Sequence, residues 1–561
     1  MASKMEKADH LEASIQDQEK KDTNVYGKEG GFQASVGDAQ QANISEHKHT
    51  VRQALRAYPW AVFWSLLVSM SIIMEGYDTQ LIGSFFGFPA FRTQFGEYSP
   101  VSKDYQVAGK WQSALGSGPT AGCIVGATLN GWMIQRFGYK PVFMVGLILM
   151  NGFVFINFFG KTIELQTVGQ VLSGIPWGVF ATIGPAYASE VCPLAFRPYL
   201  TAYTNMCFAI GQFISAGVLQ SLLARDDQWS YRIPWAIQWL WPAPLMIVAF
   251  FMPESPWWLA RKGKLEAAEH SVKRLMAENE KPRAKNTVAM MVHTNEIELE
   301  TTSGTSYFDC FKGTDLRRTE IACVIFAGQV LAGSTFAYSG TYFFEQAGMS
   351  AADAYKLALG GTAVAFVGTI LSWILMRIAG RRTIYLGGMM SMCICLLLIG
   401  FLAIAKHSSS ATWTQSAFCI LWLFSFSLSA GPIGWAVPAE VSSTRLRSKT
   451  ICLARNSYYI VQVIANVIEP YFMNPDELNW KGYTGFFWFG SAFITLVWAF
   501  FRLPETKGRT YEELDLMFAA KVPTRKFSKY HVDAYDESRN LTDRMEEHRG
   551  KVSVAADNQA H

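Results

Sequence analysis

Charged side chains are scarce in this chain of 561 residues: Asp, Glu, Lys and Arg make up 17% of it, against roughly 25% in an ordinary soluble protein. This shortage argues against a water-soluble enzyme, whose surface would need more charge. The formal net charge is only +4, so no strong positive field is available to hold a nucleic acid. Apolar residues, in contrast, make up half of the chain.

Groups that hold metals or act as nucleophiles are missing from the apolar stretches. The nine histidines all fall in polar segments, and the nine cysteines show no metal-binding or redox spacing. The sequence also has no Ser/His/Asp constellation and no phosphate-binding loop. We therefore expect no metal, no cofactor and no enzymatic activity.

Apolar runs of about 20 residues, the length that crosses a bilayer as a helix, recur from Tyr58 onward. They predict an all-α membrane protein with twelve transmembrane helices. The predicted spans lie near 59–87, 111–134, 141–160, 163–187, 201–224, 232–252, 319–344, 356–376, 383–405, 413–438, 450–472 and 483–502.

Three polar segments divide the chain. Residues 1–58 lack any sustained apolar run and read as a disordered tail. The predicted organisation is this tail, a six-helix bundle over 59–252, a linker with short helices over 253–318, a second six-helix bundle over 319–502, and a tail over 503–561.

Orientation follows the distribution of Lys and Arg rather than the net charge. With the N-terminus inside, the inside connections and the linker hold more than twice as many Lys and Arg residues as the outside connections. The short loops alone are nearly balanced, even with Arg455 counted on the inside. The bias predicts that both termini and the linker are cytosolic.

Three short motifs recur in the same order in the two halves of the sequence. SEVCPLAFR at 189–197 echoes AEVSSTRLR at 439–447, RFGYK at 136–140 echoes IAGRR at 378–382, and PESPWW from 253 echoes PETKGR from 504. Such echoes predict two halves in parallel topology, related by a pseudo-two-fold axis along the membrane normal. A substrate site between two such halves suits alternating access.

These motifs resemble the signatures of the sugar porter family of the major facilitator superfamily. More narrowly, EGYDTQL, GQVLSGIPWG, PESPWWLARKG and RLRSKTICLARN are similar to the fungal maltose permeases, which are α-glucoside:proton symporters. The resemblance covers about 58–520. It implies the major facilitator fold, a monomer in the plasma membrane, and a sugar and a proton as the substrates.

A proton-coupled carrier needs a titratable group inside the membrane. Glu75 and Asp78 lie three residues apart in the first span and hence on one helical face. A carboxylate at membrane depth is costly and marks a functional site by default, and two close carboxylates favour proton binding by one of them. The alternative is that each is merely satisfied by hydrogen bonds between helices. The resemblance implies that Asp78 is the protonation site.

Two departures from the family pattern bear on proton coupling. The sugar porters place an Arg in the fourth helix as a partner for the first-helix Asp, whereas this chain has Gln170. The α-glucoside subgroup shows an acidic residue in a GEIVG stretch of the second helix, whereas this chain has Cys123. The first change leaves the partner of Asp78 open, and the second bears on coupling stoichiometry or substrate range.

Sugar recognition needs amide, hydroxyl and aromatic groups around a wet cavity. The resemblance implies five substrate-binding positions: Gln212, Gln329, Ser334, Trp435 and Gln462. Gly328 and Ser334 stand where the family has larger side chains, which leaves room for a disaccharide. The alternative for each Gln is a hydrogen bond between helices, and for the Trp it is packing in the core or against lipid.

Charges at the inner helix ends form a predicted cytosolic gate that pairs in one state of the carrier and breaks in the other. Its members are Arg136, Glu190, Arg197, Arg381, Glu440 and Arg447. The first half departs from the family motif at Gln135 and Tyr139, so we expect a weaker gate there. The alternative is that these charges only fix the topology.

The leading hypothesis is proton-coupled uptake of a maltose-like di- or trisaccharide. A sugar facilitator, or an exporter of a glycosidic or other natural product, would use the same scaffold without this coupling. A sensor that binds sugar but barely transports it is a third possibility, although such proteins usually have a long C-terminal extension.

Overall fold

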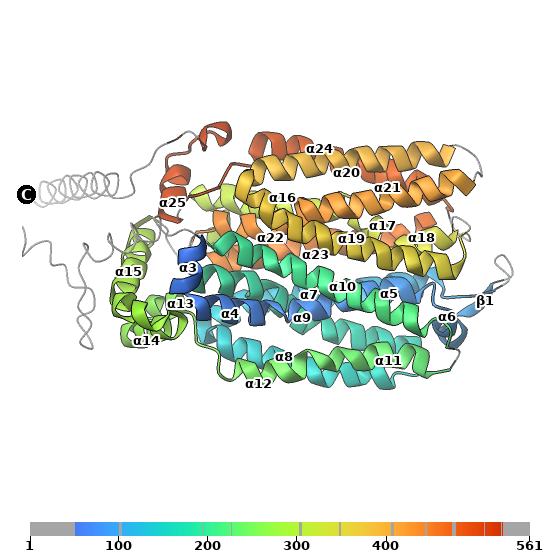
Figure 1. Ribbon diagram of the computed structural model, residues 1–561, viewed down its shortest axis with the longest axis horizontal. Helices are drawn as coiled ribbons and strands as arrows, with labels where there is room; N and C mark the ends of the chain where they lie inside the picture. Colours follow the sequence, from blue (N-terminus) through green and yellow to red (C-terminus); the bar gives the residue numbers. More distant parts are fainter. Residues whose placement is uncertain are drawn as a thin grey trace, which may run out of the picture.

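The computed structural model describes residues 51–99, 104–193, 196–225, 227–301, 306–346, 349–404, 409–443, 446–473, 478–509, 511–528 and 530. Long helices run side by side in a single bundle (Figure 1). The expected tail over 1–58 lies mostly outside the described residues; its last part forms helix α3, Val51–Ala57.

Six helical spans form the first half of the bundle. Two of them are broken into two helices that continue in one direction. They are α4 (Pro59–Ser69) with α5 (Ile72–Phe85), α7 (Gly109–Phe137), α8 (Tyr139–Phe159), α9 (Ile163–Val191), α10 (Arg197–Leu222), and α11 (Trp229–Ile237) with α12 (Pro242–Ala249). A 3₁₀ turn, Gln238–Leu240, joins α11 to α12.

Six further spans form the second half. They are α16 (Gly313–Leu331) with α17 (Ser334–Tyr338) and α18 (Gly340–Gln346), α19 (Ala351–Ile378), α20 (Arg381–Ile404), α21 (Ser409–Leu428) with α22 (Ala430–Val441), α23 (Arg447–Met473) and α24 (Thr484–Arg502). A 3₁₀ turn, Lys481–Tyr483, precedes α24. The α16–α17 break falls at Gly333, whose φ of +89° few other residues adopt.

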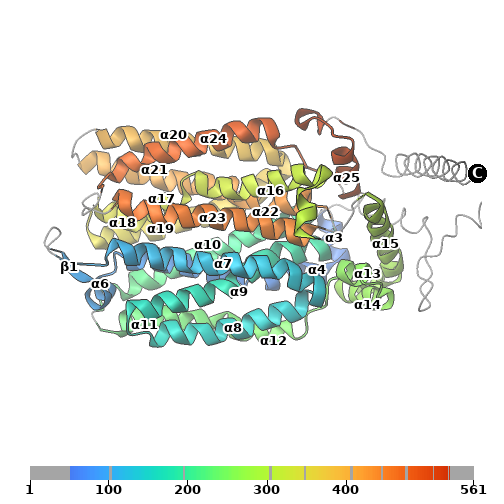
Figure 2. The same ribbon diagram turned by 180° about the vertical axis from the view of Figure 1, so that it is seen from behind.

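The two ends of the bundle carry different elements (Figures 1 and 2). At one end, here called the linker end, lie α13 (Pro256–Arg261), α14 (Leu265–Leu275), α15 (Ala284–Thr301) and α25 (Tyr511–Ala519). 3₁₀ turns at Glu278–Arg283, Tyr307–Phe311 and Thr524–Lys526 accompany them. At the other end, the ribbon end, lie α6 (Pro89–Phe95) and the antiparallel strands β1 (Glu97–Ser99) and β2 (Asp104–Gln106), with Tyr98 opposite Tyr105.

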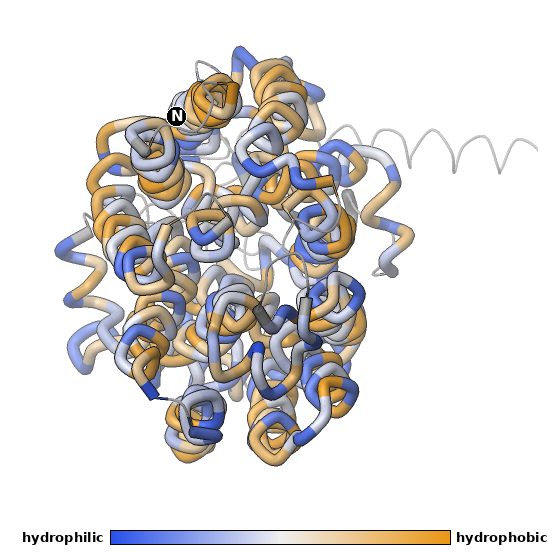
Figure 3. The backbone as a smooth tube through the Cα atoms, turned by 90° about the vertical axis from the view of Figure 1, so that its right-hand side faces the viewer, coloured by the Kyte–Doolittle hydropathy of each residue, from blue (hydrophilic) through white to orange (hydrophobic). Residues whose placement is uncertain are grey.

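Large apolar side chains are exposed on the outer faces of the bundle, as lipid contact requires. Ile247, Ile378 and Ile494 are each at least two-thirds exposed. Viewed along the helices, apolar stretches occur on all sides (Figure 3). By length and composition, nine helices of the described part could cross a membrane. The other long spans, α7, α9 and α16–α18, are less apolar.

Close helix contacts depend on glycine at two places. A Cβ at Gly122 of α7 would lie 2.1 Å from the backbone oxygen of Val171 in α9. A Cβ at Gly76 of α5 would lie 2.2 Å from the backbone oxygen of Phe208 in α10. Small residues allow such backbone contact inside a membrane. The contact at Gly76 fixes α5, which carries Glu75 and Asp78.

We predict that Gly122→Val lowers the melting temperature of the purified protein, because overpacking a tight contact costs about 1–3 kcal/mol. Gly152→Val in α8 is the matched control, since a Cβ there meets no atom within 4 Å. Equal melting temperatures for the two variants would contradict the close α7–α9 contact.

Candidate transport site

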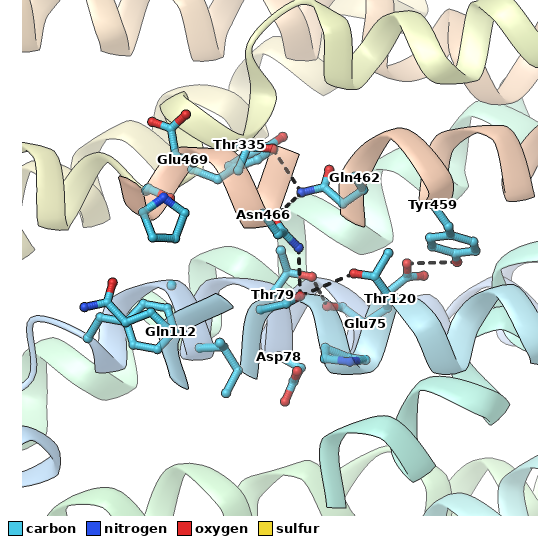
Figure 4. A pocket seen from close by; sticks show the side chains of 18 of the residues that line it. Glu75, Asp78, Thr79, Gln112, Thr120, Thr335, Tyr459, Gln462, Asn466 and Glu469 are labelled. Carbon is cyan, nitrogen blue, oxygen red and sulfur yellow. Dashed lines mark hydrogen bonds between the residues drawn. The ribbon is translucent and has the colours of Figure 1, made fainter. Parts of the chain in front are cut away.

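A cavity lies between the two halves, toward the ribbon end (Figure 4). The space between the protein atoms measures about 1130 Å³, part of it open to solvent. The first half contributes side chains from α5, α7, α9 and α10, and the second half contributes side chains from α17, α18 and α23. On α7 and α23 the lining residues come from the part nearer the ribbon end.

The charged side chains that line the cavity within the described part of the chain are all acidic: Glu75, Asp78 and Glu469. The rest of the lining combines hydroxyl and amide groups, such as Thr79, Gln112 and Asn466, with aromatic rings. No Lys, Arg or His is in this lining. Such a surface suits a neutral polar ligand and repels an anion.

Glu75 forms an ion pair across the interface between the halves. Its Oε1 accepts hydrogen bonds from Arg455 Nη2 at 2.7 Å and from the Tyr459 hydroxyl at 3.1 Å, and both of these residues are on α23. The side chains of Glu75 and Arg455 are 9% and 2% exposed. A buried charge pair is stable only while both partners are present, so this contact ties α5 to α23.

Aromatic rings surround the Arg455 guanidinium. Its central carbon lies 4.3 Å from the ring centre of Tyr458, 4.5 Å from Trp435 and 4.7 Å from Tyr459. Cation–π attraction therefore stabilises the charge in addition to Glu75.

Asp78 is held within the first half. Its Oδ1 accepts hydrogen bonds from Gln238 Nε2 at 2.8 Å and from Gln170 Nε2 at 3.2 Å. In Figure 4 its carboxylate points away from α23. Gln170 therefore contacts the carboxylate, although it replaces the family's Arg and supplies no positive charge to it.

The echoed motifs contact one another in each half at the linker end. Glu254 accepts hydrogen bonds from the backbone N–H groups of Tyr139 and Lys140, at the start of α8. Glu505 accepts hydrogen bonds from the N–H groups of Arg381 and Arg382, at the start of α20. Each carboxylate thus satisfies a helix N-terminus. Burial raises the pKa of Glu254, and its backbone donors oppose that shift.

A second contact is also duplicated. The Ser255 hydroxyl donates to Glu190 at the end of α9, and the Thr506 hydroxyl donates to Glu440 at the end of α22, the latter at 2.5 Å. These four residues occupy equivalent positions of the repeat. The sequence echoes therefore correspond to one local structure that is built twice.

The two copies obtain their cation differently. Arg381 pairs with Glu440 at 3.1 Å, whereas the equivalent position in the first half is Tyr139. There Arg261 of α13 pairs with Glu190 at 2.8 Å. The linker thus supplies the charge that the first motif lacks, and the expectation of a weaker gate rested on a motif that did not include Arg261.

Two further predicted gate residues, Arg447 and Arg136, lie against aromatic rings. Arg447 is fully buried, and its guanidinium lies 3.7 Å from the ring centre of Tyr511 in α25. The Tyr511 hydroxyl reaches a carbonyl of each half, Ser189 O at 3.5 Å and Ala439 O at 3.4 Å. Arg136 contacts Trp132 and Phe137. The side chain of Arg197 lies outside the described residues.

Comparison with known proteins identifies the family. The model of the family described as "Sugar (and other) transporter" matches residues 64–518. The chain belongs to this family of transporters. It is therefore a multi-pass integral membrane protein, and the resemblance noted from its motifs is confirmed.

Several relatives of this transporter are from Saccharomyces cerevisiae. The general alpha-glucoside permease is 35% identical over 552 residues, which cover 96% of this chain and 88% of the relative. Maltose permease MAL31 is 37% identical over 508 residues, covering 89% of this chain and 82% of the relative.

Solved structures confirm the major facilitator fold with its twelve transmembrane helices in two halves. The proton:xylose symporter XylE bound to 6-bromo-6-deoxy-D-glucose has a TM-score of 0.70 at 19% identity, covering 82% of this chain and 99% of that one. The human organic anion transporter MFSD10 has a TM-score of 0.53 at 14% identity, covering 78% and 98%.

Of the five predicted sugar-binding residues of this transporter, Gln462 lines the cavity. Its Nε2 donates to Thr335 Oγ1 at 3.0 Å and to Asn466 Oδ1 at 2.7 Å. Asn466 Nδ2 in turn donates to Gly116 O of the first half at 2.7 Å. This chain of hydrogen bonds crosses the cavity between the halves (Figure 4).

The other four residues are buried and do not belong to the cavity lining. Gln329 donates to the carbonyls of Ala430 and Gly431 at the α21–α22 break, at 3.1 Å each. Trp435 packs edge-on against Phe326, beneath Arg455. Gln212 and Ser334 are 2% and 1% exposed. Their binding roles stay predictions.

The sequence does not predict a site role for three residues: Arg455, Gln238 and Glu469. The charge distribution places Arg455 with the inside connections, but it lies within α23 and is buried. No sequence motif assigns a role to Gln238 or Glu469. An Arg or Glu inside an apolar run is the signal that identifies two of them. An amide such as Gln238 gives no comparable signal.

We predict that Arg455→Met lowers the melting temperature markedly, because removing one partner of a buried ion pair costs about 3–5 kcal/mol. Adding Glu75→Gln restores much of the loss, since the stranded charge disappears. Additive losses would contradict the pairing. Arg502→Met, which breaks the more exposed pair with Glu320, is the control and costs only about 0–1 kcal/mol.

We also predict that Arg261→Met and Arg381→Met lower the melting temperature to a similar degree, since each leaves a buried glutamate without its cation. Thermal unfolding of the two purified variants measures this. If Arg261→Met matches the wild type while Arg381→Met does not, Arg261 does not replace the missing charge of the first motif.

Proposed function

We propose that this transporter takes up an α-glucoside sugar, a maltose-like di- or trisaccharide, together with a proton across the plasma membrane. The names of the yeast relatives support the substrate class. The observation that carries the proposal is the buried Glu75–Arg455 ion pair, which joins the two halves beside Asp78 at the inner end of the cavity.

Glu75 and Asp78 form the proton-coupling pair of the proposed mechanism. A proton on Glu75 cancels the negative partner of Arg455 and weakens the tie between α5 and α23. Arg455 is not left stranded, because Trp435, Tyr458 and Tyr459 still surround its guanidinium. Proton binding thus lowers the free energy needed to separate the halves at this level, which links protonation to alternating access.

Sugar recognition in the proposal begins at Gln462, which already lines the cavity. Gln212, Gln329, Ser334 and Trp435 are buried outside the present lining, and we propose that they reach the sugar when the halves move. A neutral sugar suits the lining, because hydroxyl groups can donate to its acidic oxygens and pyranose faces can stack on its aromatic rings.

The proposed orientation places the linker end in the cytosol, from the Lys and Arg bias. The cavity then faces outward, and the duplicated Glu190 and Glu440 clusters form the closed cytosolic gate. We retain the division into bundles over 59–252 and 319–502, a cytosolic linker over 253–318, and cytosolic tails. Because one chain holds both walls of the cavity, we propose a monomer that acts as a carrier and not as an enzyme.

Uptake of labelled maltose by a host that lacks its own transporters tests the proposal. We expect accumulation against a gradient, and alkalinisation of the medium when sugar is added. Asp78→Asn and Glu75→Gln should each abolish both, because these two carboxylates form the proposed proton-coupling pair. Asp227→Asn is the control, because this partly exposed carboxylate pairs with Arg225 and does not line the cavity.

Two results would count against this function. Maltose uptake that neither changes external pH nor responds to an uncoupler would favour a facilitator. Absence of uptake for every α-glucoside, in a protein that reaches the cell surface, would contradict the substrate class.

A further inference from the structure

The outer part of the cavity carries a second set of polar groups beyond Gln462. On α23, Gln462, Asn466, Glu469 and Met473 line the cavity at spacings of three and four residues, which places them on one helical face. Seven residues separate Gln462 from Glu469, or about 10 Å along the helix axis. This distance exceeds the breadth of a single pyranose ring.

Glu469 is the unexplained group of this outer part. Its side chain is 3% exposed, and its Oε2 accepts a hydrogen bond from Trp488 Nε1 at 2.9 Å. Its Oε1 has no hydrogen-bond partner among the described residues. An unsatisfied buried acceptor is costly, and a ligand that brings a donor into the cavity would remove that cost.

The walls around Glu469 suit a sugar unit. Gln112 of α7 also lines the cavity, as do the aromatic residues Phe86 and Tyr342. Figure 4 shows Gln112 and Glu469 at the same end of the cavity, opposite Tyr459. A carboxylate fixed by Trp488, an amide and aromatic faces match the hydroxyl groups and C–H faces of a pyranose.

A metal ion fits this place less well. Ca²⁺ and Mg²⁺ need several oxygen ligands, and no group of three or more His, Cys, Asp or Glu side chains that could hold a metal occurs in the described part of the chain.

We propose that Glu469, with Gln112 and the neighbouring aromatic rings, forms a subsite for a second glucose unit. This subsite selects neutral di- and trisaccharides over monosaccharides. The inference rests on the proposed α-glucoside uptake and deepens it: the unit nearer Gln462 occupies the inner level, and a hydroxyl group of the next unit donates to Glu469 Oε1.

The test compares ligands of one and two sugar units on the full-length transporter. In Glu469→Gln, the KM for labelled maltose should rise about tenfold, the loss expected for a hydrogen bond to a charged acceptor. The concentration of methyl α-glucoside that halves maltose uptake should change less than twofold, since this ligand has one pyranose ring. Glu469→Asp keeps the charge and should give an intermediate KM if Glu469→Gln does not reach the membrane.

Glu320→Gln is the matched control. Glu320 also accepts a hydrogen bond from a tryptophan, Trp498, at 3.1 Å, but it does not line the cavity. Its variant should leave both values unchanged.

The remaining outcomes overturn the inference in distinguishable ways. An unchanged maltose KM in both Glu469 variants removes the subsite. An equal change for both ligands assigns Glu469 a structural role, and a change in pH dependence alone makes it a proton site. If the wild type transports no α-glucoside, the proposed function fails first, and the subsite fails with it.

Discussion

The ion pair between Glu75 and Arg455 is the contact on which the architecture of the site depends. Two opposite charges lie deep between the halves, where burying either one without a partner is costly. The aromatic rings around Arg455 lower that cost for the cation. Close packing at Gly76 holds α5 against α10 and so fixes the position of Glu75. Aromatic rings of α22 and α23 hold Arg455. The pair therefore makes the relative position of the halves sensitive to the charge of one carboxylate.

The two ends of the molecule complement this central contact. At the linker end, the same arrangement is built twice: Glu254 and Glu505 satisfy helix starts, and Glu190 and Glu440 collect hydroxyl and guanidinium donors. The ribbon end holds the cavity instead. This difference between the two ends matches one state of an alternating-access carrier. In that state the carrier is closed at the linker end, where the ion pairs lie, and open at the ribbon end, where the cavity lies. The use of Arg261 by the first half shows that the repeat preserves the contact without preserving the residue.

Much of the fold could be predicted from the sequence, because long apolar runs and duplicated motifs are local signals. A helix or a broken helix lies over each predicted span, and the major facilitator fold is confirmed. Glu75 and Asp78 were identifiable because carboxylates are rare inside a membrane.

The partners of these carboxylates were not predictable, since they come from remote segments. Gln238 lies 160 positions from Asp78, and Arg455 lies 380 positions from Glu75. The burial of Trp435 beneath Arg455 was equally inaccessible, because no sequence pattern encodes which side chain covers a ring.

The most direct test of the central claim is the distance between the halves at the ribbon end as a function of pH. Spin labels at Gln94 of α6 and Ala352 of α19, both exposed, allow this distance to be measured by double electron–electron resonance in the absence of sugar. If the charge on Glu75 ties the halves, lowering the pH should shift the wild type toward shorter distances. Glu75→Gln should then show those shorter distances at every pH. A Glu75→Gln variant whose distances follow pH as those of the wild type do would contradict the account.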